Sequence, residues 1–151
     1  MRLLLGALAA CLMLASPESA TAGDPSRNAQ SVHGWEAVGR LNIGGRNMCT
    51  GALIAPNLVL TAAHCVYDQN SGRAITPSSI RFEAGLNGRR VKAARTVSRV
   101  AVHPQYQFRP IGQAQIGYDI AVLRLDRPIS RAQIEPFTMA AAPERGDAVG
   151  V

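Results

Sequence analysis

The sequence lacks any apolar run long enough to cross a bilayer, which needs roughly 20 residues. Its longest apolar run, Leu3–Ala15, follows a single arginine and precedes the small residues Ala20-Thr21-Ala22. A basic start, an apolar stretch and an A-x-A site are typical of a secretory signal peptide, here residues 1–22 with cleavage before Gly23. The run therefore predicts that the protein is exported, either secreted or periplasmic, and that it has no stable membrane anchor. A competing interpretation is a lipoprotein signal at the "LAAC" of Leu8–Cys11.

Internal repeats, low-complexity segments and helical periodicity are also missing after the signal. With 47% hydrophobic residues, the composition excludes a disordered or fibrous chain. Short apolar runs separated by turn residues recur instead, which indicates an all-β protein. The expected strands are residues 35–43, 48–54, 58–61, 80–85, 90–102 and 119–125. Six short strands with no helix between them favour an antiparallel barrel or sandwich.

Lysine is almost absent, since all but one of the 16 cations are arginine, against 10 acidic residues. The formal charge of +6 is unchanged once the signal, with one cation and one anion, is removed. A basic balance can indicate binding to nucleic acid or to an anionic surface. The arginines are scattered, however, and Arg89-Arg90 is the one tight pair. We therefore expect a solvated basic surface and no nucleic-acid partner.

Cysteine is scarce, and removal of the signal leaves only Cys49 and Cys65. An even pair in an exported chain predicts a disulfide. Closing the loop between them would be worth about 3 kcal/mol in the chain-entropy model. The bridge would also fix the position of the neighbouring residue, His64.

His64 lies in "VLTAAHC", directly after an apolar run and between small alanines and a cysteine. One interpretation is a histidine in a turn whose hydrogen bonds are all to the backbone. The alternative is a general base, because the alanines leave the imidazole uncovered and a histidine side chain titrates near neutrality. The neighbouring Cys65 favours the second interpretation, since a disulfide would hold the turn.

Asp119 opens the segment "DIAVLRL", which is apolar on both faces and is expected to be a buried strand. A carboxylate at the mouth of such a strand is costly unless it is paired and hydrogen-bonded. It could cap the strand through backbone N–H groups. It could instead accept the N–H of an imidazole, fix the ring's tautomer and support the imidazolium formed during proton transfer.

"CTGALIAPNLVLTAAHC" followed by "YDIAVLRL" resembles the trypsin-like, chymotrypsin-fold serine proteases, over roughly residues 35–151. The resemblance implies the first six-stranded antiparallel barrel of a double barrel, preceded by a short segment at residues 23–34. It implies a secreted endopeptidase that acts on polypeptides without a cofactor or metal. By the same resemblance His64 is the general base, Asp119 its orienting carboxylate, and Cys49–Cys65 the flanking disulfide. His103, in "AVHPQY", takes a structural position.

The sequence departs from that family in two places. No serine has glycines on both sides, as a nucleophile beside an oxyanion hole requires. At the start, Ser31-Val32-His33-Gly34 is a poor match to the segment at which such enzymes are activated. We therefore expect the amino-terminal part of a protease, inactive alone, whose natural packing partner is a second barrel. The start and "CTGALIAP" look closer to bacterial trypsin-like and glutamyl-endopeptidase-like proteins.

Two alternatives remain open at this stage. The chain could be a non-catalytic homologue, a binding module that keeps the barrel without the nucleophile. It could also carry a zinc site built from His64, Cys49, Cys65 and His103, although the cysteines lack C-x-x-C spacing.

Overall fold

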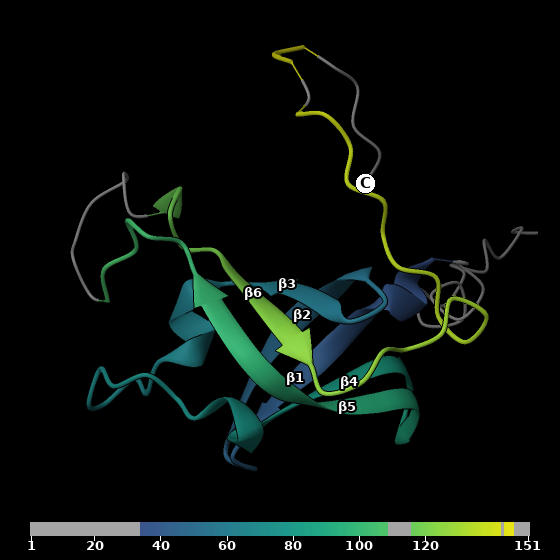
Figure 1. Cartoon of the computed structure of the whole chain (residues 1–151), viewed down its shortest axis with the longest axis horizontal. Coiled ribbons are helices and arrows are strands. Elements are labelled where there is room, and N and C mark those ends of the chain that lie inside the picture. Colours follow the sequence, from purple (N-terminus) through teal and green to yellow (C-terminus); the bar gives the residue numbers. More distant parts are fainter. Residues whose placement is uncertain (1–33, 109–115, 143, 147–151) are drawn as a thin grey trace, which may run out of the picture.

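The computed structural model describes residues 34–108, 116–142 and 144–146. Six strands close into one antiparallel barrel in the order β1-β2-β3-β6-β5-β4 (Figure 1). Their bounds are β1 Val38–Ile43, β2 Asn47–Ala55, β3 Leu58–Thr61, β4 Ile80–Asn87, β5 Arg90–Val102 and β6 Ala121–Leu125. The expected all-β fold with six antiparallel strands is confirmed. The predicted signal peptide lies outside the described residues.

The barrel interior is filled by the inward face of each strand. In β1, in β4 as far as Ala84, and in β6, every second residue is buried, as the two-residue period of a strand requires. Phe82 on β4 is the largest fully buried side chain, and its ring lies against Gly39 on β1. A Cβ at Gly39 would come within 2.5 Å of the Phe82 ring, so only glycine leaves room for this ring. The other large, fully buried side chains are Leu41, Leu53, Ile80, Leu123, Ile129, Ile134, Val59, Val66 and Val97.

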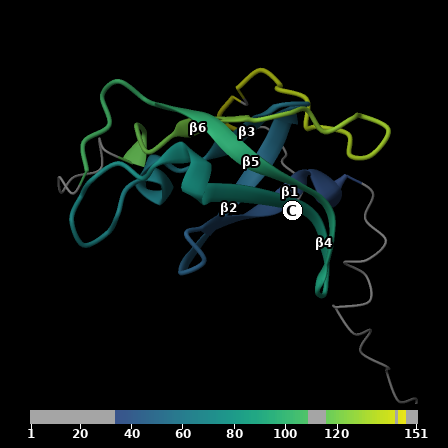
Figure 2. The ribbon, with the colours of Figure 1, turned by 60° about the horizontal axis from the view of Figure 1, so that its bottom comes forward.

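β5 is the longest strand and pairs with two neighbours. Its first half pairs with β4 and its second half with β6, and the register shifts between Val97 and Arg99. An extra residue of this kind bends a strand and increases its twist, which lets one strand serve both sides of a closed barrel. The β4–β5 hairpin projects from the body of the barrel (Figure 2).

Two of the expected strands begin later in the structure than in the sequence prediction. Residues Trp35–Ala37 form a short 3-10 helix, η1, rather than the start of β1. β6 begins at Ala121 instead of Asp119, because the preceding residues turn: the Asp119 N–H donates to the Ile116 carbonyl oxygen at 3.3 Å. The expectation that both faces of this strand are buried was also wrong, since Val122 is only partly buried and Arg124 is exposed. Two further 3-10 helices, η2 Ala63–Val66 and η3 Pro77–Ser79, interrupt the loop between β3 and β4.

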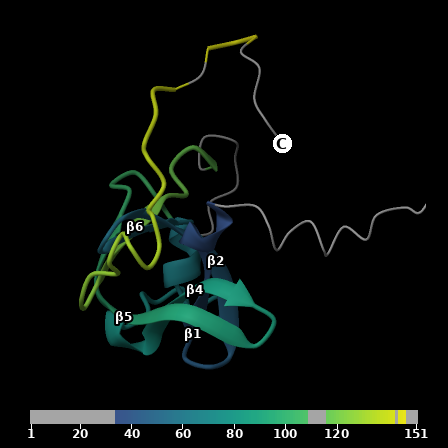
Figure 3. The same cartoon turned by 90° about the vertical axis from the view of Figure 1, so that its right-hand side faces the viewer.

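After β6 the chain runs back over the barrel before leaving it. Ile129 and Ile134 are buried, and the Phe137 N–H donates to the Leu53 carbonyl oxygen on β2 at 2.9 Å. The exposed residues 138–142 then extend away from the barrel (Figures 1 and 3). In the described ranges, no helix has both the length and the apolar character to cross a membrane.

Candidate active site

The site lies where the end of β3 meets the start of β6. These strands are antiparallel neighbours, with Thr61 opposite Ala121. The residues just beyond the end of one strand are therefore close to those just before the start of the other. His64 sits in η2, three residues after Thr61, and Asp119 sits two residues before Ala121. The barrel topology thus brings together two residues that are 55 positions apart in the sequence.

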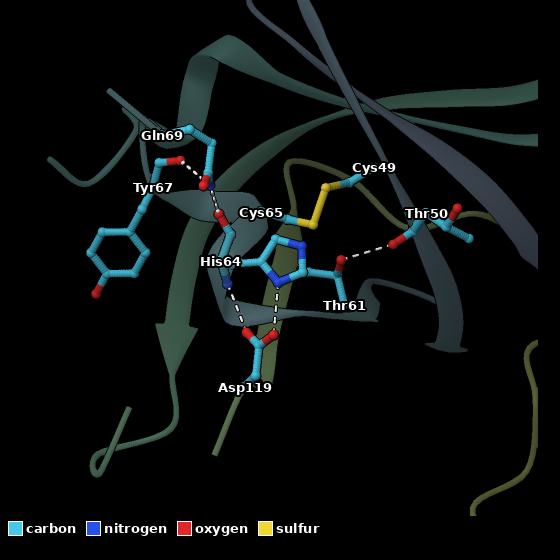
Figure 4. Close-up of a disulfide and its surroundings, with 8 residues drawn as sticks. All are labelled: Cys49, Thr50, Thr61, His64, Cys65, Tyr67, Gln69 and Asp119. Atoms are coloured by element: carbon cyan, nitrogen blue, oxygen red, sulfur yellow. Dashed lines mark hydrogen bonds and ion pairs between the residues drawn. A yellow bond between two sulfur atoms is a disulfide. The ribbon is translucent and has the colours of Figure 1, made fainter. Parts of the chain in front are cut away.

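Asp119 contacts His64 through both of its carboxylate oxygens (Figure 4). The distance from Oδ2 to the His64 ring Nδ1 is 2.7 Å, and Oδ1 accepts the His64 main-chain N–H at 2.8 Å. Because the Asp119 carboxylate contacts both the main-chain N–H and the ring of His64, it orients both the turn and the imidazole. The carboxylate thus accepts the imidazole N–H that was considered from the sequence, and the backbone N–H that it also accepts belongs to η2 and not to β6. Nδ1 must carry the proton when the ring is neutral, which leaves Nε2 with a lone pair.

The electrostatics of the pair favour an ionised carboxylate. Burial raises the pKa of the Asp119 carboxyl. The hydrogen bonds from the His64 ring and main chain, the charge of His64 and the Ala63 N–H outweigh this effect and hold the pKa below its ordinary value of 3.8. The Asp119 side chain is 28% exposed and that of His64 is 53% exposed. A half-exposed imidazole backed by a carboxylate can exchange protons with a group that approaches from solvent.

The turn that carries His64 is fixed by a disulfide and by hydrogen bonds. Cys49 at the start of β2 and Cys65 in η2 are bonded, with Cα atoms 6.1 Å apart. The Thr61 hydroxyl donates to the Thr50 carbonyl oxygen at 2.8 Å, which ties β3 to β2 just before the turn. The structure contains the bridge that the sequence predicts.

Gln69 is a contributor that the sequence analysis missed. Its side-chain amide donates to the carbonyl oxygens of His64, at 2.8 Å, and Tyr67, at 3.2 Å (Figure 4). The His64 carbonyl oxygen also accepts the Tyr67 main-chain N–H at 3.3 Å, so the Gln69 amide adds a second hydrogen bond there and joins η2 to the residue that follows it. The signal that could have found Gln69 is its position a few residues after the histidine, in an otherwise polar loop.

Comparisons with known proteins show the family to which the chain belongs. The family model described as Trypsin matches residues 25–151. The chain belongs to the trypsin family. A trypsin from Saccharopolyspora erythraea is 38% identical over 96 residues, which cover 60% of this chain and 36% of that trypsin. Coagulation factor XI from Bos taurus is 32% identical over 127 residues, which cover 78% of this chain and 18% of the factor.

A solved structure shares the fold of this trypsin-family chain. A Glu endopeptidase, solved in complex with MPD, superposes with a TM-score of 0.54 at 28% identity, covering 66% of this chain and 44% of that one. The chain therefore has the fold of a single chymotrypsin-like barrel, and it spans less than half the length of each of these relatives.

Aromatic side chains pack against one another in the loops beside His64. Tyr67 stacks on Phe108 with ring centroids 5.5 Å apart and contacts Tyr106 at 5.6 Å. Burial raises the pKa of the Tyr106 hydroxyl, and the charges of Asp119 and Tyr67 add to the rise. Tyr106 is therefore neutral over the physiological range and contributes packing here.

His103, which the sequence analysis placed in a structural position, has its ring stacked on Tyr118 with centroids 4.9 Å apart. Its Nδ1 accepts the Gln105 N–H at 3.2 Å, and its main-chain N–H donates to the Ile120 carbonyl oxygen. Among the described residues, the cluster of ligand-type atoms consists of Cys49, His64 and Cys65 and does not include His103. The described residues therefore do not form a zinc site that joins Cys49, Cys65 and His64 to His103.

Proposed function

We propose that this trypsin-family barrel is part of a secreted serine endopeptidase and carries two of the three groups of its catalytic triad. His64 Nε2 would take the proton of a serine hydroxyl and pass it to the leaving amine of a polypeptide substrate. Asp119 would hold the ring in the tautomer that leaves Nε2 unprotonated, and would stabilise the imidazolium. The observation that carries the proposal is the double contact of the Asp119 carboxylate with the ring and main chain of His64.

The nucleophile and the oxyanion hole would come from a second barrel. No serine in the 151 residues has a glycine on each side, and the chain covers 36% of the Saccharopolyspora trypsin. Large apolar side chains also remain exposed, among them Ile120 beside Asp119, and Phe137 and Met139 in the segment that follows β6. A second barrel packed on this one would cover such a surface.

Secretion is part of the same proposal. Its support is the Cys49–Cys65 disulfide, which persists in oxidising compartments, together with the signal-like pattern of residues 1–22.

The deciding experiment is to read the coding sequence past the codon for Val151 and to express the extended chain. We expect a glycine-flanked serine in frame and peptide hydrolysis by the product. Asp119→Asn should lower kcat by about 10⁴ because the ring loses its tautomer, and His64→Ala should abolish triad-dependent turnover. His103→Ala is the matched histidine control, and it should retain more activity than either variant.

A non-catalytic binding module is the second candidate, and the observation favouring it is the lack of a glycine-flanked serine in the sequence. The 151-residue chain alone should hydrolyse no peptide at a rate that His64→Ala removes. If the coding sequence contains no such serine beyond Val151, the endopeptidase proposal fails and the binding module stands.

A further inference from the structure

The disulfide and the histidine form a cluster of three ligand-type atoms. The Sγ atoms of Cys49 and Cys65 and a ring nitrogen of His64 all lie within 4.8 Å of one another. Asp119 contacts Nδ1, and Figure 4 shows the other ring nitrogen on the side that faces the disulfide. While the two sulfurs are bonded to each other, neither can act as a thiolate ligand.

We propose that reduction of the Cys49–Cys65 disulfide converts this cluster into a binding site for a divalent zinc-like cation. An external dithiol supplies two electrons and two protons, the S–S bond breaks, and the dithiol leaves as a cyclic disulfide. Both cysteines are then thiols. The cation displaces the two thiol protons into solvent and forms two metal–sulfur bonds and one bond to His64 Nε2, and water completes the four-coordinate site.

The ligand-type atoms already lie within 4.8 Å of one another, but the two sulfurs must move apart once the bond between them is broken. With metal–sulfur bonds near 2.3 Å and a metal–nitrogen bond near 2.0 Å, tetrahedral geometry needs sulfurs about 3.8 Å apart and a sulfur–nitrogen distance of about 3.5 Å. The Cα atoms of the cysteines are 6.1 Å apart, so rotation of the side chains can separate the sulfurs without opening the barrel. The half-exposed His64 side chain leaves access for the water ligand.

Asp119 already makes the contact that supports a metal-bound histidine. Histidine ligands usually donate their second ring N–H to a carboxylate, which fixes the tautomer and makes the ligating nitrogen more basic. Here Asp119 Oδ2 lies 2.7 Å from His64 Nδ1, so Nε2 is the nitrogen left to bind a cation. The pair that orients a general base therefore also orients a metal ligand.

The binding site itself goes beyond the proposed function, but its consequence rests on that function. A cation on Nε2 occupies the lone pair that would accept the serine proton. Reduction with metal uptake would therefore switch the base off, and removal of the metal would free the Nε2 lone pair again.

The test is titration of the full chain with Co²⁺, which replaces zinc and reports thiolate ligands by charge-transfer absorption. Cys11→Ser is used as the background so that only two thiols are present. The chain is reduced with a dithiol and desalted anaerobically to remove the dithiol, and far-UV circular dichroism follows the β-sheet signal. We expect one Co²⁺ per reduced chain with charge-transfer bands, and no such bands from the oxidised chain.

Substitutions distinguish a built site from thiols that bind metal without the fold. His64→Ala should weaken Co²⁺ binding at least tenfold, Asp119→Asn should weaken it about tenfold, and His103→Ala should leave it unchanged. If reduction unfolds the chain, Co²⁺ should restore the β-sheet signal in the background protein and not in His64→Ala. Absent charge-transfer bands, or equal binding by the His64→Ala and background chains, would overturn the proposal. Neither result depends on proteolysis, so the endopeptidase proposal is tested separately.

Discussion

The interior of the barrel and the rim around His64 are held together by different forces. Leu53, Phe82 and Leu123 are completely buried, whereas the side chains of His64 and Asp119 are 53% and 28% exposed. The interior is stabilised by removal of apolar surface from water. The rim depends on a disulfide and on hydrogen bonds that compete with solvent. Substitutions inside should therefore change the stability of the whole barrel, while those at the rim should mainly change the geometry of the site.

The largest effect should come from the interior. Phe82→Ala removes the largest fully buried side chain and should lower the free energy of unfolding by about 3–5 kcal/mol, through lost burial and the cavity left behind. Urea unfolding followed by circular dichroism would measure it. Phe137→Ala is the matched control, because Phe137 is 37% exposed and should cost much less. Equal losses for the two variants would show that the barrel interior is not the main source of stability.

The disulfide is the strongest single element of the rim. Replacing Cys49 and Cys65 together with alanine should lower the free energy of unfolding by about 3 kcal/mol, because the bridge closes a loop with a sequence separation of 16. Comparing the oxidised parent with the double variant by urea unfolding gives this difference. An unchanged midpoint would mean that the bridge does not clamp the turn.

Gln69→Ala should have a smaller effect, a loss of about 1 kcal/mol, since water can replace the amide at two exposed carbonyl oxygens. Hydrogen exchange at the amides of η2 should speed up in this variant. The control is Gln105→Ala, whose side chain makes no hydrogen bond with the described part of the chain and should change neither quantity. If the Gln69→Ala chain kept the parental exchange rates, the Gln69 amide would not stabilise η2.

The smallest effect is a dependence on acid pH. The folded-state pKa of Asp119 lies below its ordinary value of 3.8, so the unfolded chain binds more protons over that interval. The carboxylate's contribution to stability is therefore complete above about pH 5 and is lost as the pH falls through the folded pKa. Unfolding free energies between pH 6 and pH 3 should fall less steeply in Asp119→Asn than in the parent. Parallel curves would contradict the direction of the shift.

Much of the barrel could be predicted from the sequence, because strand periodicity is local. The bounds of β3 and β5 match the expected residues 58–61 and 90–102. The errors lie where tertiary contacts override the local pattern. Trp35–Ala37 were expected to open the first strand but form a 3-10 helix, and Asp119 turns out of the sheet toward His64.

The site was predictable only in part. Cys49, Cys65, His64 and Asp119 stand in short motifs, and the structure brings all four together. Gln69 and the ring contacts of Tyr67 have no such motif, since they arise from how the loop after β3 folds back on itself. Loop hydrogen bonds of this kind depend on three-dimensional position, and sequence spacing alone does not encode them.

Nuclear magnetic resonance of the imidazole protons tests the contact between His64 and Asp119 most directly. An Nδ1–H proton that is hydrogen-bonded to a carboxylate resonates far downfield, and His64→Ala assigns it. We expect this resonance in the parent chain and its loss in Asp119→Asn. It should persist in Asp126→Asn, because the Asp126 carboxylate instead accepts the Arg127 main-chain N–H. A downfield His64 proton that survives Asp119→Asn, or one that is absent from the folded parent chain, would contradict the account.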